Sequence, residues 1–270
     1  MIKAVKGIAK GVARSLGYDR ADVAAARMYC ERHALAMTSR SHGRDRGRIL
    51  CYHSVGQPSM GVNDVTPQQF KRHIELALGA GYRFVPASKL ANGGGNKNEL
   101  AITFDDGLVS VKEKAAPILK EFDIPWSVFV VSEWAEHTQP WTEGFVLPWS
   151  ELEELAAGGA EIGSHSRTHP DFAKIGRAQM IDELRGSRQM FEQRLGFLPS
   201  QFAIPYGQSM NWPQVAGEVA REAGYELFYA QAEATRPPGT IPRTFVTKFD
   251  HDLIFKALLH GAYDRWEEWY

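Results

Sequence analysis

The sequence predicts an α/β fold in which parallel strands form either a barrel or an open sheet. From residue 48 onward, short apolar runs alternate with runs of helical period, which is the pattern of strands joined by crossover helices. The apolar runs are only four or five residues long, as expected of buried strands in a parallel sheet. The chain has 270 residues, 44% of them hydrophobic, which is enough for one such core.

The predicted strands and helices follow one another in regular alternation. The strands span residues 49–53, 82–86, 100–104, 127–131, 160–163, 201–204 and 227–230. The helices span residues 67–79, 111–122, 150–157, 178–195, 215–223 and 252–266. Residues 92–96 contain three consecutive glycines, which predicts a flexible loop.

Two helix starts carry recognisable capping residues. Thr66 precedes Pro67 and is followed three residues later by Gln69, so Thr66 is the predicted N-cap. Ser150 stands three residues before Glu153, which predicts a second N-cap, and Gly158 with Gly159 would end that helix.

The first 48 residues differ in charge from the rest of the chain. They hold eleven Lys or Arg and four acidic residues and so carry +7, which leaves −8 on the remainder. We therefore predict a basic helical extension and linker over residues 1–47, with its polar link at residues 39–47, and a catalytic domain over residues 48–270. The total charge of −1 gives no reason to expect nucleic acid as a partner.

Residues 1–16 place apolar side chains at helical spacing among basic ones. The pattern predicts a short amphipathic helix that could rest on an anionic membrane surface as a peripheral contact, or else pack on the body of the protein or fray. Lys3, Lys6, Lys10 and Arg14 interrupt what would be the apolar core of a signal peptide, and no window of about 18 apolar residues exists. We therefore expect a cytoplasmic protein, at the inner face of the membrane if the helix binds there. Cys30 and Cys51 form no disulfide framework or Cys-based zinc site.

The first polar cluster that could carry chemistry follows the strand at residues 100–104. Asp105 and Asp106 are adjacent carboxylates, whose repulsion a divalent cation would relieve. Because side chains alternate along a strand, one carboxylate could bind a metal while the other faces a water molecule. The alternative is a solvated Asp-Asp-Gly turn.

Two more clusters follow later strands. His165 and His169 stand four residues apart and could converge on one metal, or could be two surface histidines. Pro205-Tyr206-Gly207 predicts a fixed turn whose backbone N–H groups could face a ligand, although a strand simply ending in a turn would look the same. Together the clusters suit Zn²⁺ or a related first-row metal with a carboxylate general base, and so predict hydrolysis of an amide or ester.

Three motifs in this order resemble those of the polysaccharide deacetylases, carbohydrate esterase family four, which includes the nodulation chitooligosaccharide deacetylases. They are Thr103-Phe104-Asp105-Asp106-Gly107, His165-Ser166-Arg167-Thr168-His169 and Pro205-Tyr206-Gly207. The resemblance runs from about Ile49 to Phe249 and takes in Tyr52-His53-Ser54-Val55 and the stretch 149–165.

The resemblance implies a fold, an activity and roles for individual residues. The fold would be a distorted (β/α) barrel of seven or eight parallel strands. Asp105 would be the base, Asp106, His165 and His169 the metal ligands, and the backbone N–H of Tyr206 an oxyanion donor. The cofactor would be a divalent metal, Zn²⁺ first, with Co²⁺, Ni²⁺ or Mn²⁺ as alternatives. Family members hydrolyse N-acetyl groups on glucosamine-containing glycans and release acetate, so the expected substrate is an N-acetylated glycan or lipid-linked sugar.

Two departures from the family pattern leave residues unassigned. The family often has an Arg ahead of Pro-Tyr that orients the catalytic Asp, whereas Ala203 and Ile204 stand there in this chain; Arg243 could replace it, or could be a surface Arg at a strand start. The family's general acid is a His in a Leu-x-His strand motif. His260 matches the letters but lies in a helical pattern, and His53 is the rival candidate. Either histidine could instead have a purely structural role, in which its ring bonds to a neighbouring strand.

Aromatic residues complete the predicted site. Trp134 and Trp141 flank a loop after a strand and could stack on sugar rings, and Arg243 is grouped with them as a substrate-binding candidate. Two other hypotheses stay open at this point. One is a metal-dependent amidohydrolase or O-acetyl esterase acting on a small non-sugar substrate, and the other is a catalytically inactive carbohydrate-binding or scaffold protein.

Overall fold

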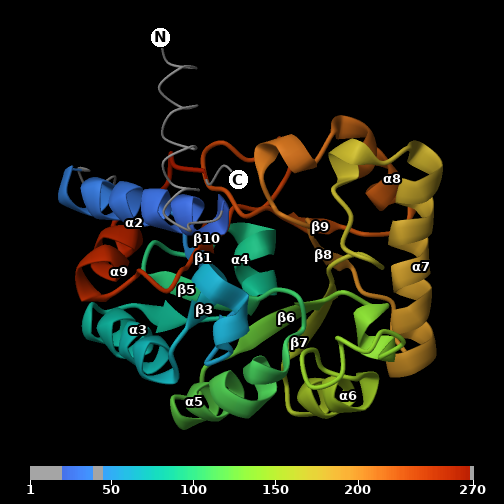
Figure 1. Cartoon of the computed structure of the whole chain (residues 1–270), viewed down its shortest axis with the longest axis horizontal. Coiled ribbons are helices and arrows are strands. Elements are labelled where there is room, and N and C mark those ends of the chain that lie inside the picture. The colour runs from blue at the N-terminus through green and yellow to red at the C-terminus, as the bar shows by residue number, and fades with distance from the viewer. Residues whose placement is uncertain (1–19, 39–44, 268–270) are drawn as a thin grey trace.

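The computed structural model describes residues 20–38 and 45–267 and shows a curled parallel sheet surrounded by helices (Figure 1). The amphipathic helix predicted over residues 1–16 and most of the predicted linker lie outside the described residues. Within the described part of the chain, no helix is both long enough and apolar enough to cross a membrane.

Every strand pair in the main sheet is parallel. The strands are β1 (Arg48–Tyr52), β4 (Arg83–Phe84), β5 (Glu99–Phe104), β6 (Trp126–Val130), β7 (Glu161–Ser164), β8 (Gln201–Ala203), β9 (Leu227–Tyr229) and β10 (Thr244–Phe245). Their order is β10-β1-β5-β6-β7-β8-β9, with β4 paired to β5 at the side. A separate parallel pair joins β2 (Ser54–Val55) and β3 (Asp64–Val65).

The two ends of this strand order come back toward each other. A parallel bridge joins Tyr229 of β9 to Ile241, which lies just before β10. The backbone N–H of Ala230 also donates to the Ile241 carbonyl at 2.9 Å. Because Ile241 leads directly into β10, the sheet curls round on itself, and the predicted distorted barrel is confirmed.

Helices cover the outside of the sheet. They are α2 (Arg20–Thr38), α3 (Pro67–Gly79), α4 (Ala87–Gly93), α5 (Ala116–Glu121), α6 (Trp149–Ala157), α7 (Arg177–Leu195), α8 (Gln214–Glu222) and α9 (Asp252–Leu259). A π-helical turn, η2 (Val111–Ala115), leads into α5, and short 3₁₀ turns occur at η1 (Pro58–Asn63), η3 (Trp134–Glu136), η4 (Phe172–Lys174) and η5 (Ser209–Asn211). Figure 1 shows α3, α5, α6 and α7 following one another around the rim, with α2 lying beside α9.

Three predictions about helix ends or loops were wrong. The helix after residue 148 begins at Trp149, with Pro148 at the N-cap position, so Ser150 is not a cap. The last helix ends at Leu259 instead of residue 266, because Gly261 takes a left-handed φ of 88°. The loop predicted at residues 92–96 begins inside α4, which runs through Gly93 and ends with Gly94 in the left-handed conformation. By contrast, Thr66 caps α3 as predicted, accepting the Gln69 backbone N–H at 3.1 Å.

The barrel interior is apolar below the candidate site. Ile49, Ala101, Phe129, Ala203 and Tyr229 form one buried cluster, and each comes from a different strand. Because side chains alternate along a strand, the next inward-facing positions on β1 and β5 are Cys51 and Thr103. The core therefore ends in a buried polar layer at the carboxyl ends of the strands.

Helix α2 packs against the barrel through a buried charged pair. Arg32 is fully buried, and its Nε donates to Asp250 Oδ1 at 2.6 Å. The guanidinium lies 4.4 Å from the centre of the Tyr263 ring, in cation–π contact. The described half of the N-terminal region is thus tied to the body of the protein, while the domain boundary at residue 47 stays a prediction.

Candidate metal centre

The candidate metal ligands lie where the parallel strands end. Asp106 comes two residues after β5 ends, and His165 comes directly after β7. Asp106, Ser166, His169 and Tyr206 all have positive φ values, between 63° and 73°. Such left-handed conformations are costly for residues other than glycine, and their clustering is typical of functional sites. The strained turns bring ligand side chains from different strands toward one point.

Three ligand atoms converge. Asp106 Oδ1 lies 3.6 Å from His165 Nε2 and 3.7 Å from His169 Nε2. The three residues each offer one ligand atom, and these atoms lie within 4.8 Å of one another. Two ligand atoms bound tetrahedrally to one Zn²⁺ stand about 3.4 Å apart. The spacing therefore fits a divalent metal with only small movements of the side chains.

The protonation states also fit a metal. Nδ1 of His165 bonds to the Ala203 carbonyl at 2.8 Å, which requires its proton there and leaves the Nε2 lone pair facing Asp106. Burial, despite opposing contributions from Asp105, lowers the pKa of His165 to about 3 and that of His169 to about 4. Both rings are therefore neutral near pH 7, the form that binds metals.

Asp106 has an environment that a cation would improve. Burial raises its pKa to about 6, and the neighbouring charge of Asp105 adds to the rise while His53 opposes it. A buried carboxylate beside a second one is costly when both are ionised. A divalent cation in contact with Asp106 would offset that cost.

Asp105 is held by Arg243. Nη1 of Arg243 donates to Asp105 Oδ1 at 2.6 Å, and Nη2 donates to Oδ2 at 2.7 Å. Arg243 is fully buried, and its Nε donates to the Ala230 carbonyl at 3.0 Å. This geometry does not fit the substrate-binding role predicted for Arg243. It places Arg243 where it orients Asp105, the other role that the sequence suggested.

Cys51 and Thr103 complete the surroundings of Asp105, and the sequence predicted no contact between either residue and Asp105 or Arg243. Burial acts to raise the pKa of Asp105, but the charge of Arg243 and its hydrogen bonds outweigh burial, so the pKa lies well below its usual value. The thiol of Cys51 donates to Asp105 Oδ2 at 3.4 Å, and Thr103 Oγ1 accepts from Arg243 at 3.2 Å. Cys51 gave no signal because it sits within an apolar strand.

The structure separates the two candidate general acids. His53 follows β1 and is 8% exposed, with its ring packed edge-on against Phe245. Its Nδ1 has no hydrogen-bond partner among the described residues, and the ring is close enough to Asp105 and Asp106 to interact with both electrostatically. His260 is exposed at the C-cap of α9, and its side chain makes no contact with the site within the described residues. Only His53 therefore lies with the cluster.

The turn after β8 brings Tyr206 beside the ligands. Its ring centre lies 4.9 Å from that of His169. Within the described residues, no acceptor takes the Tyr206 backbone N–H. The next residue must be glycine, because φ is 65° at Gly207 and a Cβ there would lie 2.3 Å from the Gln231 side chain.

Aromatic residues form one wall of the site. The Trp134 ring centre lies 5.5 Å from that of His169, and Trp141 meets Trp134 edge-on at 5.1 Å. The Trp141 side chain is 49% exposed. The two tryptophans singled out from the sequence thus extend from the ligands toward solvent.

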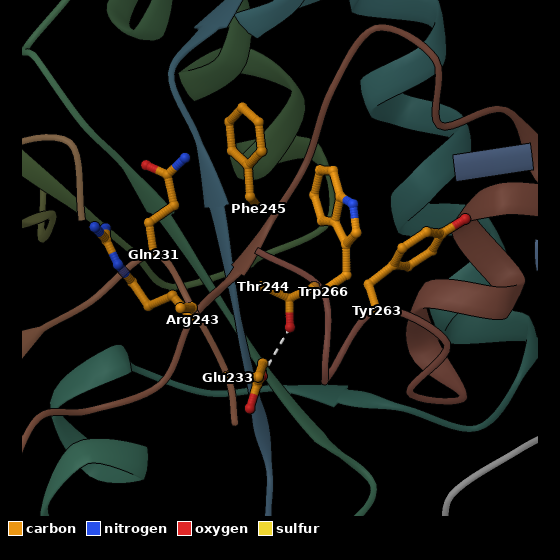
Figure 2. A pocket seen from close by; sticks show the side chains of 8 residues that line it. Gln231, Glu233, Arg243, Thr244, Phe245, Tyr263 and Trp266 are labelled. Atoms are coloured by element: carbon orange, nitrogen blue, oxygen red, sulfur yellow. Dashed lines mark hydrogen bonds between the residues drawn. The ribbon is translucent and has the colours of Figure 1, made fainter. Parts of the chain in front are cut away.

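A separate pocket lies beside β10 (Figure 2). Thr244 Oγ1 donates to Glu233 at 2.8 Å across its floor, and Arg48 also donates to Thr244 and to Glu233. Arg243 directs its guanidinium away from these groups (Figure 2). Thr244 and Glu233 therefore bond to each other and to Arg48, which is typical of a structural network.

Comparisons with known proteins agree with this geometry. A family model described as polysaccharide deacetylase matches residues 92–228, a range that contains Asp105, Asp106, His165, His169 and Tyr206. The Bacillus subtilis protein YxkH is 24% identical over 200 residues, 72% of this chain and 66% of that protein. A peptidoglycan-N-acetylglucosamine deacetylase of Bacillus cereus is 27% identical over 114 residues, 42% of this chain and 38% of that protein. The chain thus spans less than two thirds of the length of each.

A solved structure shares the fold. The Streptococcus pyogenes deacetylase PplD, solved in complex with acetate, superposes with a TM-score of 0.66 and 20% identity, covering 79% of this chain and 96% of that one. At this identity the likeness concerns the curled parallel sheet and its surrounding helices. Since the family model spans more than half of the sequence and includes the converging carboxylate and imidazoles, the chain belongs to the polysaccharide deacetylase family.

Proposed function

We propose that this protein is a divalent-metal-dependent hydrolase that removes N-acetyl groups from an N-acetylated glycan and releases acetate. The observation that carries the proposal is the convergence of Asp106, His165 and His169, with Asp105 held beside them by Arg243. Family membership and the Bacillus cereus relative, named for its action on peptidoglycan N-acetylglucosamine, support the substrate class. Zn²⁺ is the metal that these ligands favour, with Co²⁺, Ni²⁺ and Mn²⁺ as alternatives.

Asp105 serves as the general base in this proposal. A divalent metal at the three ligands supplies Lewis acidity toward the acetyl carbonyl and toward water. Asp105 is ionised at neutral pH, because the pKa-lowering effect of Arg243 exceeds the effect of burial. It can therefore accept a proton from the attacking water, while the two hydrogen bonds from Arg243 fix the direction in which it does so.

His53 and Tyr206 serve the later part of the reaction. The unpartnered backbone N–H of Tyr206 donates to the oxygen that becomes negative in the tetrahedral intermediate. His53, whose Nδ1 has no partner among the described residues, donates a proton to the leaving amine. Within the described part of the chain, neither the Tyr206 N–H nor His53 Nδ1 has a hydrogen-bond partner, and both residues adjoin the cluster, which supports these roles.

The exposed Trp141 favours a sugar over a small non-sugar substrate. Flat aromatic faces stack on the apolar faces of sugar rings, and Trp141 with Trp134 offers such a surface next to His169. A wall that reaches into solvent suits one sugar within a longer glycan or a lipid-linked sugar. A small acyl amide would gain nothing from it.

The test is acetate release by the purified full-length chain. The panel holds N-acetylated chitooligosaccharides, peptidoglycan fragments, a lipid-linked N-acetylated sugar, an O-acetylated sugar and a small non-sugar acetamide. We expect acetate from at least one N-acetylated sugar, its loss with chelator and its return with Zn²⁺. Release from the O-acetylated sugar or the acetamide alone, or release indifferent to chelator, would contradict the proposal.

A further inference from the structure

The loop that carries both candidate histidine ligands is held by an unusual run of hydrogen bonds. Four consecutive backbone N–H groups, from Ser166 to His169, each donate to a side-chain oxygen. Ser166 donates to Ser164 Oγ at 3.2 Å, and His169 donates to Ser166 Oγ at 2.9 Å. The two N–H groups between them, of Arg167 and Thr168, both donate to one carboxylate oxygen of Glu183, at 3.0 Å and 2.8 Å.

Helix α7 supplies the other side of this contact. Glu183 and Ser187 are four residues apart and so lie on one face of the helix. Ser187 Oγ lies 2.8 Å from Ser164 Oγ, and Thr168 Oγ1 donates to Glu183 Oε1 at 2.5 Å. Both ends of the loop are therefore attached to the same helix face.

Burying the Glu183 carboxylate costs free energy that packing contacts alone would not offset. It is only 3% exposed, and no Lys or Arg pairs with it in an ion pair among the described residues. Its charge is compensated by two backbone N–H groups and one hydroxyl of the loop. The neighbouring Asp182, in contrast, is largely exposed and accepts a hydrogen bond from the Arg167 side chain at 3.0 Å.

The loop needs such support because its backbone is strained. Ser166 and His169 have φ values of 70° and 64°, and residues other than glycine keep such conformations only where the surroundings impose them. If the hydrogen bonds to α7 were lost, the loop would relax and His169 Nε2 would move from its position 3.7 Å from Asp106.

We propose that Glu183 and Ser187 are positioning residues for the metal, acting through the loop 165–169 to fix the distance between His165 and His169. The inference rests on the proposed function, since it gives the loop a purpose only if the site holds a metal. Residues that orient metal ligands commonly change metal affinity by 10–100-fold when replaced.

The test compares Glu183→Gln with Asp182→Asn in the full-length chain. Both substitutions remove one carboxylate charge from adjacent positions on α7. Only the first weakens an acceptor of two backbone N–H groups, because a neutral amide oxygen accepts a hydrogen bond less strongly than a carboxylate oxygen. Zn²⁺ affinity is measured by competition with a chromophoric chelator, and the visible absorption of the Co²⁺-loaded protein reports ligand geometry. We expect Glu183→Gln to weaken Zn²⁺ binding by about 10–100-fold and to change the Co²⁺ spectrum. Asp182→Asn should leave both as in the unmodified protein.

Equal Zn²⁺ affinity and an unchanged Co²⁺ spectrum in Glu183→Gln and Asp182→Asn would overturn the positioning role alone. If the unmodified protein bound no Zn²⁺, the proposed function and the positioning role would both fall. If circular dichroism showed Glu183→Gln to be unfolded, Ser187→Ala and Thr168→Val would decide. Each removes one hydrogen bond of the set and should weaken Zn²⁺ binding by up to about 10-fold, and unchanged affinity in both would overturn the inference.

Discussion

At the scale of single residues, the position of Asp105 depends on a contact between distant parts of the chain. Arg243 is 138 residues away in sequence and reaches Asp105 from the segment that curls the barrel round. The guanidinium offers two parallel N–H groups to the two carboxylate oxygens, which fixes the plane of the carboxylate as well as its charge. The orientation of the Asp105 carboxylate is thus set by the curvature of the sheet.

Replacing Arg243 with Lys should lower turnover while keeping the metal. A lysine keeps the positive charge but donates from a single nitrogen, so Asp105 loses its fixed orientation. We expect kcat for acetate release to fall by roughly 10²-fold, because small displacements of a reacting group have effects of that size. Zn²⁺ affinity should change little, since Arg243 bonds to Asp105 and not to the three ligands.

Arg177→Lys is the matched control, because Arg177 forms an exposed ion pair with Glu222 on the surface. Its kcat should equal that of the unmodified protein. A kcat for Arg243→Lys as high as that of this control would show that Arg243 does not orient the base.

At the scale of elements, local patterns predicted most strands and helices well, and failures occurred where a distant contact or a glycine decided the outcome. The strand at residues 100–104 and the cap at Thr66 follow from adjacent residues alone. The shortening of α9 depends on Gly261, which the helical spacing of the flanking apolar residues concealed. Strand β10 has only two residues, too few for any periodicity to show.

Some residues of the candidate site could likewise be predicted from local sequence, whereas others depend on contacts between distant parts of the chain. Asp105, Asp106, His165 and His169 could be named from the sequence because each follows directly on an apolar run and the spacing between them resembles a known family. The choice between His53 and His260 could not be made from the sequence, since it depends on which strand ends share one rim. The full burial of Arg243 could not be predicted either, because burial in the barrel is not visible in a local pattern.

Helix α3 contributes a pH-dependent term to stability through His73. His73 is buried, bonds Tyr52 Oη through Nδ1 at 3.0 Å, and donates from Nε2 to the Asp250 carbonyl. Burial, partly offset by its hydrogen bond to Asp250, lowers its pKa from 6.5 to about 4. The unfolded chain therefore takes up a proton at a pH where the folded chain does not.

The stability supplied by neutral His73 should be complete above pH 6.5 and decline as the pH falls toward 4. The lost contribution amounts to about 3 kcal/mol of unfolding free energy. The measurement is urea denaturation between pH 7 and pH 4, with chelator present, for the unmodified protein and His73→Gln. The difference between the two unfolding free energies should shrink as the pH falls. Two curves that stay parallel over this range would contradict the assignment.

At the scale of the whole molecule, α2 and the neighbouring C-terminal part of the chain stabilise each other on one side of the barrel. Arg32 on α2 reaches Asp250 just before α9, and Tyr263 Oη, beyond α9, donates to the Arg32 carbonyl at 2.7 Å. Trp266 Nε1 donates to Glu31 on the same helix. Helix α2 and the segment after α9 therefore enclose one buried charged pair.

Arg32→Met should destabilise the protein by about 3–5 kcal/mol, because the buried Asp250 would lose its counter-charge. The midpoint of urea denaturation reports the loss. Arg27→Met on the same helix is the control, since Arg27 pairs with Glu31 at the surface, and its loss should cost no more than about 1 kcal/mol. Equal effects of the two substitutions would show that the buried pair does not hold α2 to the barrel.

The central claim is that groups from separate strand ends meet around one metal ion and that Asp105 acts beside it without binding it. The most direct measurement is the zinc content per chain after purification with Zn²⁺ and gel filtration, for the unmodified protein, Asp105→Asn and His165→Ala. We expect one zinc per chain both in the unmodified protein and in Asp105→Asn, although Asp105→Asn should no longer release acetate. His165→Ala should contain no zinc. An unmodified protein without zinc, or a His165→Ala variant that retains a full equivalent, would contradict the account.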